Sequence, residues 1–293
     1  RSTLFPYTTL FRSLELGLIL DALKIVRVRK ALGLKREMVG VRFMPYQKEY
    51  DLSEAEERRH IALCEVVSDA SRGIHGKTRS GMLSCKAAGY IIGLEEAPSN
   101  IRSGLEDYRN EKYASYSVSH QVSNSKDYID HSIYGVEAFP VNHDVNGADI
   151  VIFITTAKNV MRIMQGYARY YGVAGNLLTM GVHGICSDLI SRSFVNNDIN
   201  ISLLSPDSRD RGNFDAREMG VSIPVNMLET VLDGILETVN LTENNAPKRE
   251  ILARLEYPEE LGFPIRMNYD YAIQAAEYSR YCEECMQYDS ENG

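Results

Sequence analysis

The chain has 293 residues, of which 44% are hydrophobic and 25% are charged, and its formal net charge is -8. This length and apolar content are enough to bury one large core or two ordinary ones. With 40 acidic against 32 basic residues, the composition argues against sequence-independent binding to nucleic acid, which needs dense cationic contacts with phosphates.

The longest apolar run, residues 150–154, is far shorter than the ~20 residues that span a bilayer, so we expect no membrane association. Five cysteines in a chain of this size do not form a disulfide framework, which is typical of a reducing compartment. The sequence therefore predicts a cytoplasmic protein.

The two ends of the chain differ from its middle. Residues 1–13 read RSTLFPYTTLFRS, which resembles the translation of a sequencing adapter, and we expect them to be an artefact outside the native protein. Residues 14–241 are expected to form the main domain. Residues 242–293 are expected to be a C-terminal extension that is helical or partly disordered.

The first half of the chain predicts helices around one strand. Apolar residues at helical spacing predict a helix over residues 14–32, and β-branched residues predict a strand over residues 38–44. Asp51 or Ser53 is expected to cap a long helix that runs to about Ser71, and Ser53 followed by Glu56 matches the capping-box pattern. Cys64 lies beside the apolar stripe of this helix. Residues 98–135 are polar and rich in tyrosine, so we expect an irregular or partly helical segment that covers the site.

The second half predicts several strands in succession. Strands are expected over residues 136–141, 149–155, 177–182, 199–204 and 221–225, and helices over residues 157–171 and 226–239 and from Cys186 onward. Consecutive strands without helices between them favour an α+β or mixed α/β fold, with helices packed on a mixed sheet, over a doubly wound parallel fold. No glycine-rich phosphate-binding fingerprint of a Rossmann or P-loop protein is present.

Three cysteines are the strongest candidates for chemistry. Cys85 and Cys186 each follow a short apolar run and open a helical pattern, which indicates a weak internal duplication. A thiol at a helix start meets the positive end of the helix dipole, and this favours the thiolate. If Cys64 projects from a neighbouring helix, three thiolates converge and leave one coordination position open on an iron–sulfur cluster or a zinc ion.

Two other interpretations stay open. Cys64 and Cys85 are 21 positions apart and form no tight ligand pair, and free cysteines are often simply buried. The protein would then be a cofactor-free small-molecule binding or accessory protein with cysteines in its core. A weaker alternative is a thiol enzyme with Cys85 or Cys186 as nucleophile and His183 as base.

Three further places carry candidate residues. His183, in a glycine-flanked turn three positions before Cys186, is a candidate ligand or proton carrier, although a lone loop histidine more often faces solvent. Arg209, in the charged loop 205–218, is a candidate for contacting an anionic small molecule or for bracing the loop. Cys282 and Cys285 form a C-x-x-C pair without a second pair, and two intervening glutamates disfavour thiolates, so an acidic tail is the favoured interpretation.

Several of these residues also carry a family resemblance. Its elements, in order, are LGLKREMVGVRF at residues 32–43, Cys64 with Ala70 and Gly73, Ser84-Cys85-x-Ala87-Ala88, Cys186-Ser187-Asp188 and Ser208-Arg209-Asp210. This order resembles the domain of unknown function 169 family, an uncharacterised archaeal conserved region, over residues 14–241, with Met38 in place of the usual proline. The resemblance implies that the cysteines are not incidental, but it implies no reaction.

Overall fold

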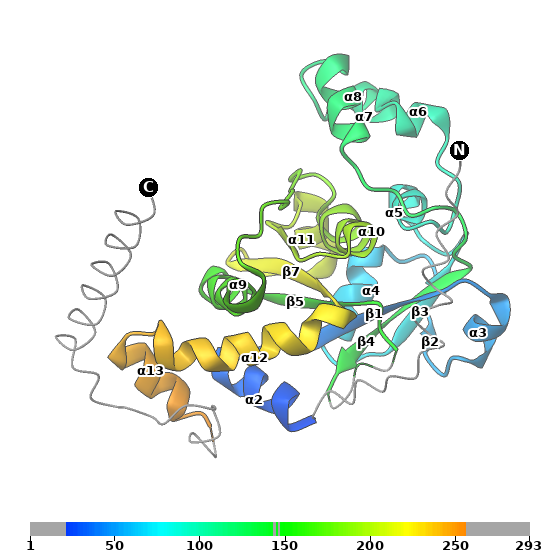
Figure 1. The fold of residues 1–293 in the computed structure, drawn as a ribbon. Helices are drawn as coiled ribbons and strands as arrows, with labels where there is room; N and C mark the ends of the chain where they lie inside the picture. The colour runs from blue at the N-terminus through cyan, green and yellow to red at the C-terminus, as the bar shows by residue number, and fades with distance from the viewer. Residues whose placement is uncertain (1–21, 143–144, 146, 256–293) are drawn as a thin grey trace, which may run out of the picture.

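The computed structural model describes residues 22–142, 145 and 147–255 (Figure 1). In this part of the chain seven strands form one sheet in the order β2-β3-β4-β1-β5-β7-β6. Every neighbouring pair is antiparallel except β2 and β3, which are parallel. The sheet is therefore mixed and helices pack on it, which confirms the expected fold class.

The strands are short, and the helices range in length from one turn to almost five turns. The strands are β1 Met38–Met44, β2 Glu56–Glu57, β3 Gly76–Arg79, β4 Gly135–Val141, β5 Ile150–Thr156, β6 Asn200–Ser202 and β7 Glu218–Pro224. The helices are α2 Ala22–Leu32, α3 Gln47–Leu52, α4 Leu63–Ala70, α5 Lys86–Ile91, α6 Ser99–Arg102, α7 Leu105–Arg109, α8 Tyr116–Asn124, α9 Ala157–Tyr171, the π-helix η1 Gly184–Ser191, α10 Arg192–Asn196, α11 Pro206–Gly212, α12 Val225–Leu241 and α13 Asn245–Leu252.

The sheet separates two hydrophobic cores. Successive side chains of a strand point to opposite faces, so in β5 Val151 contributes to the first core and its neighbour Ile152 to the second. The first core is completed by α2, α9, α12 and α13, and the second by α4, α5 and η1. Figure 1 shows α12 and α2 together on one side of the strands, with α4 and α5 on the other.

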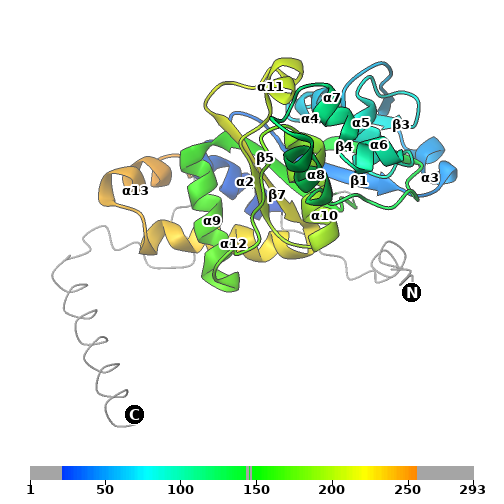
Figure 2. The same cartoon turned by 90° about the horizontal axis from the view of Figure 1, so that it is seen from above.

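The pattern-based predictions are accurate for two elements with a clear apolar pattern. The strand at Met38–Met44 and the helix at Ala157–Tyr171 have the expected bounds. The segment 98–135 is partly helical, as expected, and contains α6, α7 and α8. These helices project from the body of the protein on the side of α5 (Figures 1 and 2).

The helix expected from Ser53 to Ser71 is wrong. Ser53 instead ends α3, its hydroxyl donates to Glu137 at 2.6 Å, and it accepts from the backbone N–H of Ala55. The chain then forms β2 beside β3, and α4 begins only after Ala62. The Glu65 carboxylate accepts from the backbone N–H of Ala62, so it caps a later and shorter helix.

The strand expected at residues 177–182 is also wrong. Its backbone pairs with a side chain and not with a strand, because the Asn200 amide exchanges two hydrogen bonds with Leu178, at 2.8 and 2.9 Å. What Cys85 and Cys186 share is therefore a place at the start of a helix.

Residues 1–13, Cys282 and Cys285 lie outside the described residues, so the predictions made for them stay predictions. Of the extension at 242–293, the described part contains α13, Asn245–Leu252. Over the described ranges, the structure contains no helix with both the length and the apolar character needed to cross a membrane.

Candidate thiol site

The starts of α4 and α5 lie side by side because the residues before them pair like parallel strands. Ile61 and Leu83 form an isolated parallel bridge, and the backbone N–H of Ser84 donates to the carbonyl of Ile61 at 3.0 Å. Cys64 follows in the first turn of α4, and Cys85 is the N-cap residue of α5. This pairing brings together two cysteines that are 21 positions apart.

The third cysteine comes from η1, which packs against both α4 and α5. The start of η1 is close to the backbone after β6, because a Cβ on Gly184 would lie only 2.8 Å from the amide nitrogen of Ser205. Asp188 anchors the same helix by accepting from the hydroxyls of Thr179 and Ser202 at 2.7 and 2.9 Å. Cys186 is thereby held against the second core.

The three thiols lie within electrostatic range of one another. Burial raises the pKa of Cys64 to about 12, with a further contribution from Cys85. Burial also raises the pKa of Cys186 strongly, and Cys85 and Cys64 add to that shift. The expectation that a helix start would favour a thiolate is wrong for Cys186, because loss of water and like charges outweigh the helix dipole.

The cysteines differ in exposure. Cys64 and Cys186 are buried in the second core, as the core interpretation predicts, whereas Cys85 is partly exposed. All three are free thiols. Over residues 22–142, 145 and 147–255, the structure contains no group of three or more His, Cys, Asp or Glu side chains arranged to hold a metal ion.

A partly buried polar network lies next to Cys186 and connects η1 to the projecting segment. The carboxylate of Asp107, on α7, accepts from Lys112 and Lys126 at 2.8 Å each and lies 3.5 Å from Nε2 of His183. Although burial opposes the shift, these hydrogen bonds hold the pKa of Asp107 well below its usual range. The side chain of Lys126 is only 2% exposed, and this carboxylate is its ion-pair partner.

His183 is buried and does not face solvent. Its side chain contacts Asp107, and it makes no hydrogen bond to a cysteine within the described residues. Burial lowers its pKa, against the opposing effect of Asp107. His183 therefore lies in the network beside the thiols, but this arrangement does not provide a base on a cysteine for a thiol enzyme.

Arg209 braces a loop, and its guanidinium makes no hydrogen bond to the thiols among the described residues. On α11, its guanidinium donates to the backbone carbonyls of Asp215, Leu203 and Glu218 at 2.7 to 2.9 Å. These contacts match the bracing role that was one of its two predicted roles. Arg217, in the same loop, pairs with Asp215 at the surface.

No sequence pattern identifies the polar residues of the site. Asp107, Lys126 and Tyr113 lie in the polar segment, where no spacing marks them as partners of η1. The Tyr113 hydroxyl is buried without a hydrogen-bond partner in the described part of the chain. Burial, with Asp107 and Asp188 nearby, raises the pKa of Tyr113 to about 12. The only signal in the sequence was the tyrosine-rich composition of residues 98–135, from which this segment was expected to cover the site.

The fold and the site together define a mixed α/β protein with a cysteine cluster in one of its two cores. The chain belongs to the domain of unknown function 169 family, described as uncharacterised ArCR, which it matches over residues 27–234. This confirms the resemblance seen in the sequence. No curated protein matches the chain, and no solved structure matches it.

Proposed function

We propose that the protein holds a thiolate-ligated metal centre, either an iron–sulfur cluster or a zinc ion, on Cys64, Cys85 and Cys186. The observation that carries this proposal is that three cysteines from separate elements come within electrostatic range of one another in one place. Soft metals prefer thiolate ligands, and no other cysteine lies within residues 22–255.

The charge balance of the cluster supports a bound cation. Burial and mutual repulsion keep Cys64 and Cys186 protonated at neutral pH when no positive charge is present. A metal supplies that charge, displaces the thiol protons and couples its binding to pH. Because the thiols are not arranged as ligands, loading requires their side chains to rotate toward a common centre.

The neighbouring polar groups support a ligand at this centre. Three thiolates leave one position open on a tetrahedral ion or on one iron of a cluster. The unpartnered hydroxyl of Tyr113 lies within electrostatic range of Asp107 and Asp188, and Asp188 is in turn within electrostatic range of Cys186. We propose that a small molecule occupies the open position and that Tyr113 donates a hydrogen bond to it, with α7 and α8 as its cover.

Metal analysis of protein purified without oxygen tests the proposal. We expect stoichiometric iron with broad visible absorption, or stoichiometric zinc. Cys64→Ala, Cys85→Ala and Cys186→Ala should each lose most of the metal. The double variant Cys282→Ala/Cys285→Ala, which removes the two other thiols of the chain, should keep it.

A core variant separates loss of a ligand from damage to the fold. Leu189→Ala changes a buried residue of η1 and should cost about 2–5 kcal/mol of unfolding free energy while metal is retained. Folded protein that contains no metal, and whose three thiols react at rates that follow only their solvent exposure, would contradict the metal centre. It would favour the second candidate, a cofactor-free binding protein, for which the burial of Cys64 and Cys186 in the second core is the specific support.

A further inference from the structure

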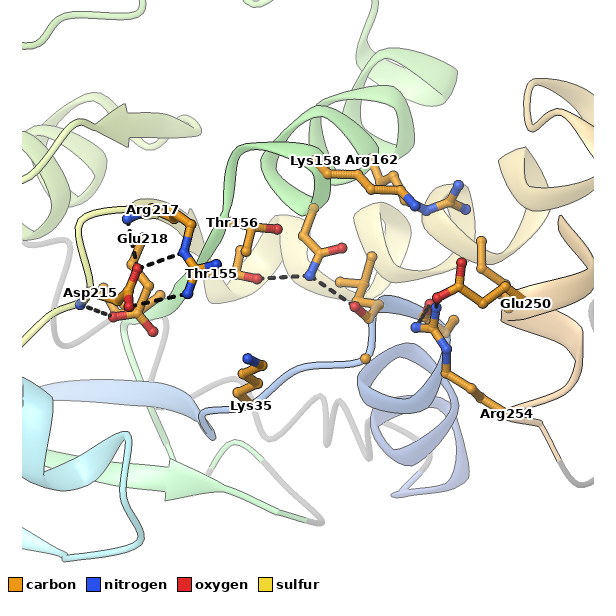
Figure 3. A pocket seen from close by; sticks show the side chains of 16 residues that line it. Lys35, Thr155, Thr156, Lys158, Arg162, Asp215, Arg217, Glu218, Glu250 and Arg254 are labelled. Atoms are coloured by element: carbon orange, nitrogen blue, oxygen red, sulfur yellow. Dashed lines mark hydrogen bonds and ion pairs between the residues drawn. The ribbon is translucent and has the colours of Figure 1, made fainter. Parts of the chain in front are cut away.

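A cavity of about 500 Å³ lies among α2, α9 and α13 (Figure 3). Its wall comes from the end of α2 and the turn after it, the end of β5, the start of α9, the start of β7, and α13. Neither the three cysteines nor His183 lines it. Its volume is in the range of sites for small molecules.

A buried arginine lines the cavity without adequate partners. The side chain of Arg162, on α9, is only 1% exposed. Within the described residues none of its three guanidinium nitrogens has a hydrogen-bond partner, although Nη1 forms an ion pair with Glu243. A buried charged group without hydrogen bonds is costly, and a guanidinium matches the geometry of an oxyanion. Arg162 therefore points to an anionic ligand.

The other charges of the cavity leave a positive excess. Arg217 pairs with Asp215 at 3.0 Å and Arg254 with Glu250 at 2.9 Å, so these four side chains neutralise one another. Glu218 is likewise neutralised, because both of its oxygens accept from Arg36, outside the cavity.

The excess charge comes from two exposed lysines. Lys35 and Lys158 line the cavity, and neither forms an ion pair with a described residue. Figure 3 shows Lys35 on one side of the cavity and Lys158 with Arg162 on α9 at the other. In a chain with a net charge of -8, this local positive excess favours an anion.

The start of α9 adds backbone donors to the same place. This helix of 15 residues begins after Thr156, whose side chain makes no capping hydrogen bond. Its first backbone N–H groups therefore remain available to an anion. Asn159 fixes the helix start instead by donating to the carbonyl of Leu32 and to the hydroxyl of Thr155 at 2.8 Å each.

We propose that this cavity binds a phosphate-bearing small molecule. The phosphate lies at the start of α9 between Lys35 and Lys158, and Arg162 binds a second anionic group deeper in the cavity. The apolar lining from Leu32, Ile154 and Ile251 contacts the uncharged part of the ligand. Phosphate is favoured over carboxylate because it has more acceptor oxygens for the lysines, the guanidinium and the backbone donors together.

Calorimetric titration of the full chain with pyrophosphate tests this site, with citrate and sodium chloride of matched ionic strength as parallel titrants. We expect saturable pyrophosphate binding that is at least about 10-fold tighter than citrate binding. Lys35→Gln/Lys158→Gln, which changes only exposed side chains, should weaken it about 10-fold. Lys48→Gln, at an exposed lysine of α3, should bind like the unchanged protein.

Arg162 is tested with its ion-pair partner removed as well. Arg162→Met/Glu243→Gln should melt at or above the Tm of the unchanged protein, because no buried charge is left behind, while pyrophosphate binding falls at least about 10-fold. Equal heats for all variants would mean an adventitious ion only and would overturn the site. If citrate binds as tightly as pyrophosphate and is weakened by the same variants, the proposal that the ligand carries a phosphate is overturned. Cys186→Ala should keep pyrophosphate binding, so this test is independent of the metal centre.

Discussion

The thiol cluster and the α9 cavity stabilise charge in opposite ways. Around the thiols the ionised groups are well partnered, as Asp107 is with two lysines, while the thiols themselves are held neutral by burial. In the cavity the situation is reversed, because Arg162 is charged and lacks hydrogen bonds. A neutral thiol cluster gains from a cation, and an unsatisfied guanidinium gains from an anion. The two sites should therefore bind ligands of opposite charge.

The largest effect is expected when the network beside the thiols loses its carboxylate. Asp107→Asn leaves Lys126 buried without an anion, and breaking a buried ion pair costs about 3–5 kcal/mol. We expect faster hydrogen exchange over residues 105–126, with unchanged protection in α9 and α12, measured by mass spectrometry. Glu106→Gln, which removes the neighbouring carboxylate, is the control. Equal loss of protection in α9 would mean that the network does not stabilise this segment locally.

Backbone packing between α12 and α9, the helix that carries Arg162, gives the second largest effect. A Cβ on Gly234 would lie 2.1 Å from the carbonyl oxygen of Gly166, where α12 crosses α9. Gly234→Ala must separate these helices and should cost about 1–3 kcal/mol of unfolding free energy, measured with denaturant. Gly175→Ala, where a Cβ meets nothing within 4 Å, should be nearly neutral. A Gly234→Ala variant as stable as the Gly175→Ala control would contradict the tight crossing.

The same contrast explains how much could be read from the sequence. Apolar and β-branched residues predicted β1, which is buried on both faces, and helical spacing predicted α9, while the order of cysteine motifs predicted the family. The segment before Cys186 was misread because its apolar residues suggested a strand. Only the fold brings Asn200 beside Leu178 to take up the backbone hydrogen bonds.

Both candidate sites contain residues that no local pattern identifies. Arg162 falls within a helix that the sequence predicts, but the burial of its guanidinium with an ion pair and no hydrogen bond among the described residues follows only from the packing of α13 against α2 and α12. Asp107 and Lys126 are polar residues in a polar segment, and their role depends on the position of His183 more than 50 residues further along the chain.

A buried carboxylate on β4 provides a charge that, unlike Arg162, is fully partnered. Glu137 pairs with Arg42 at 2.7 Å and accepts from Ser53, and although burial opposes it, contacts with His75, Ser53 and Arg42 lower its pKa. A lowered pKa gives stability that is present above the unfolded value of about 4.5 and is lost as pH falls through the folded value.

Glu137→Gln should therefore remove about 1–3 kcal/mol at pH 7 and flatten the decline of stability between about pH 5 and pH 3. Denaturant unfolding at several pH values measures this. Glu56→Gln, at an exposed carboxylate, should leave the pH profile unchanged. A Glu137→Gln profile as steep as that of the unchanged protein would assign the acid sensitivity to other groups.

The last prediction involves no change in stability. It concerns the order in which the three thiols are alkylated, which tests directly how they differ. In metal-free protein, iodoacetamide should modify Cys85 at least about 10-fold faster than Cys64 and Cys186, because the last two are buried and their pKa values are raised. Peptide mass spectrometry over time follows each thiol, and denaturant should make the three rates similar. Zinc should slow the reaction of Cys85 if the three thiols hold one ion, because a coordinated sulfur is no longer free to attack. Fast modification of Cys186 in folded protein would contradict the burial that makes the cluster depend on a cation.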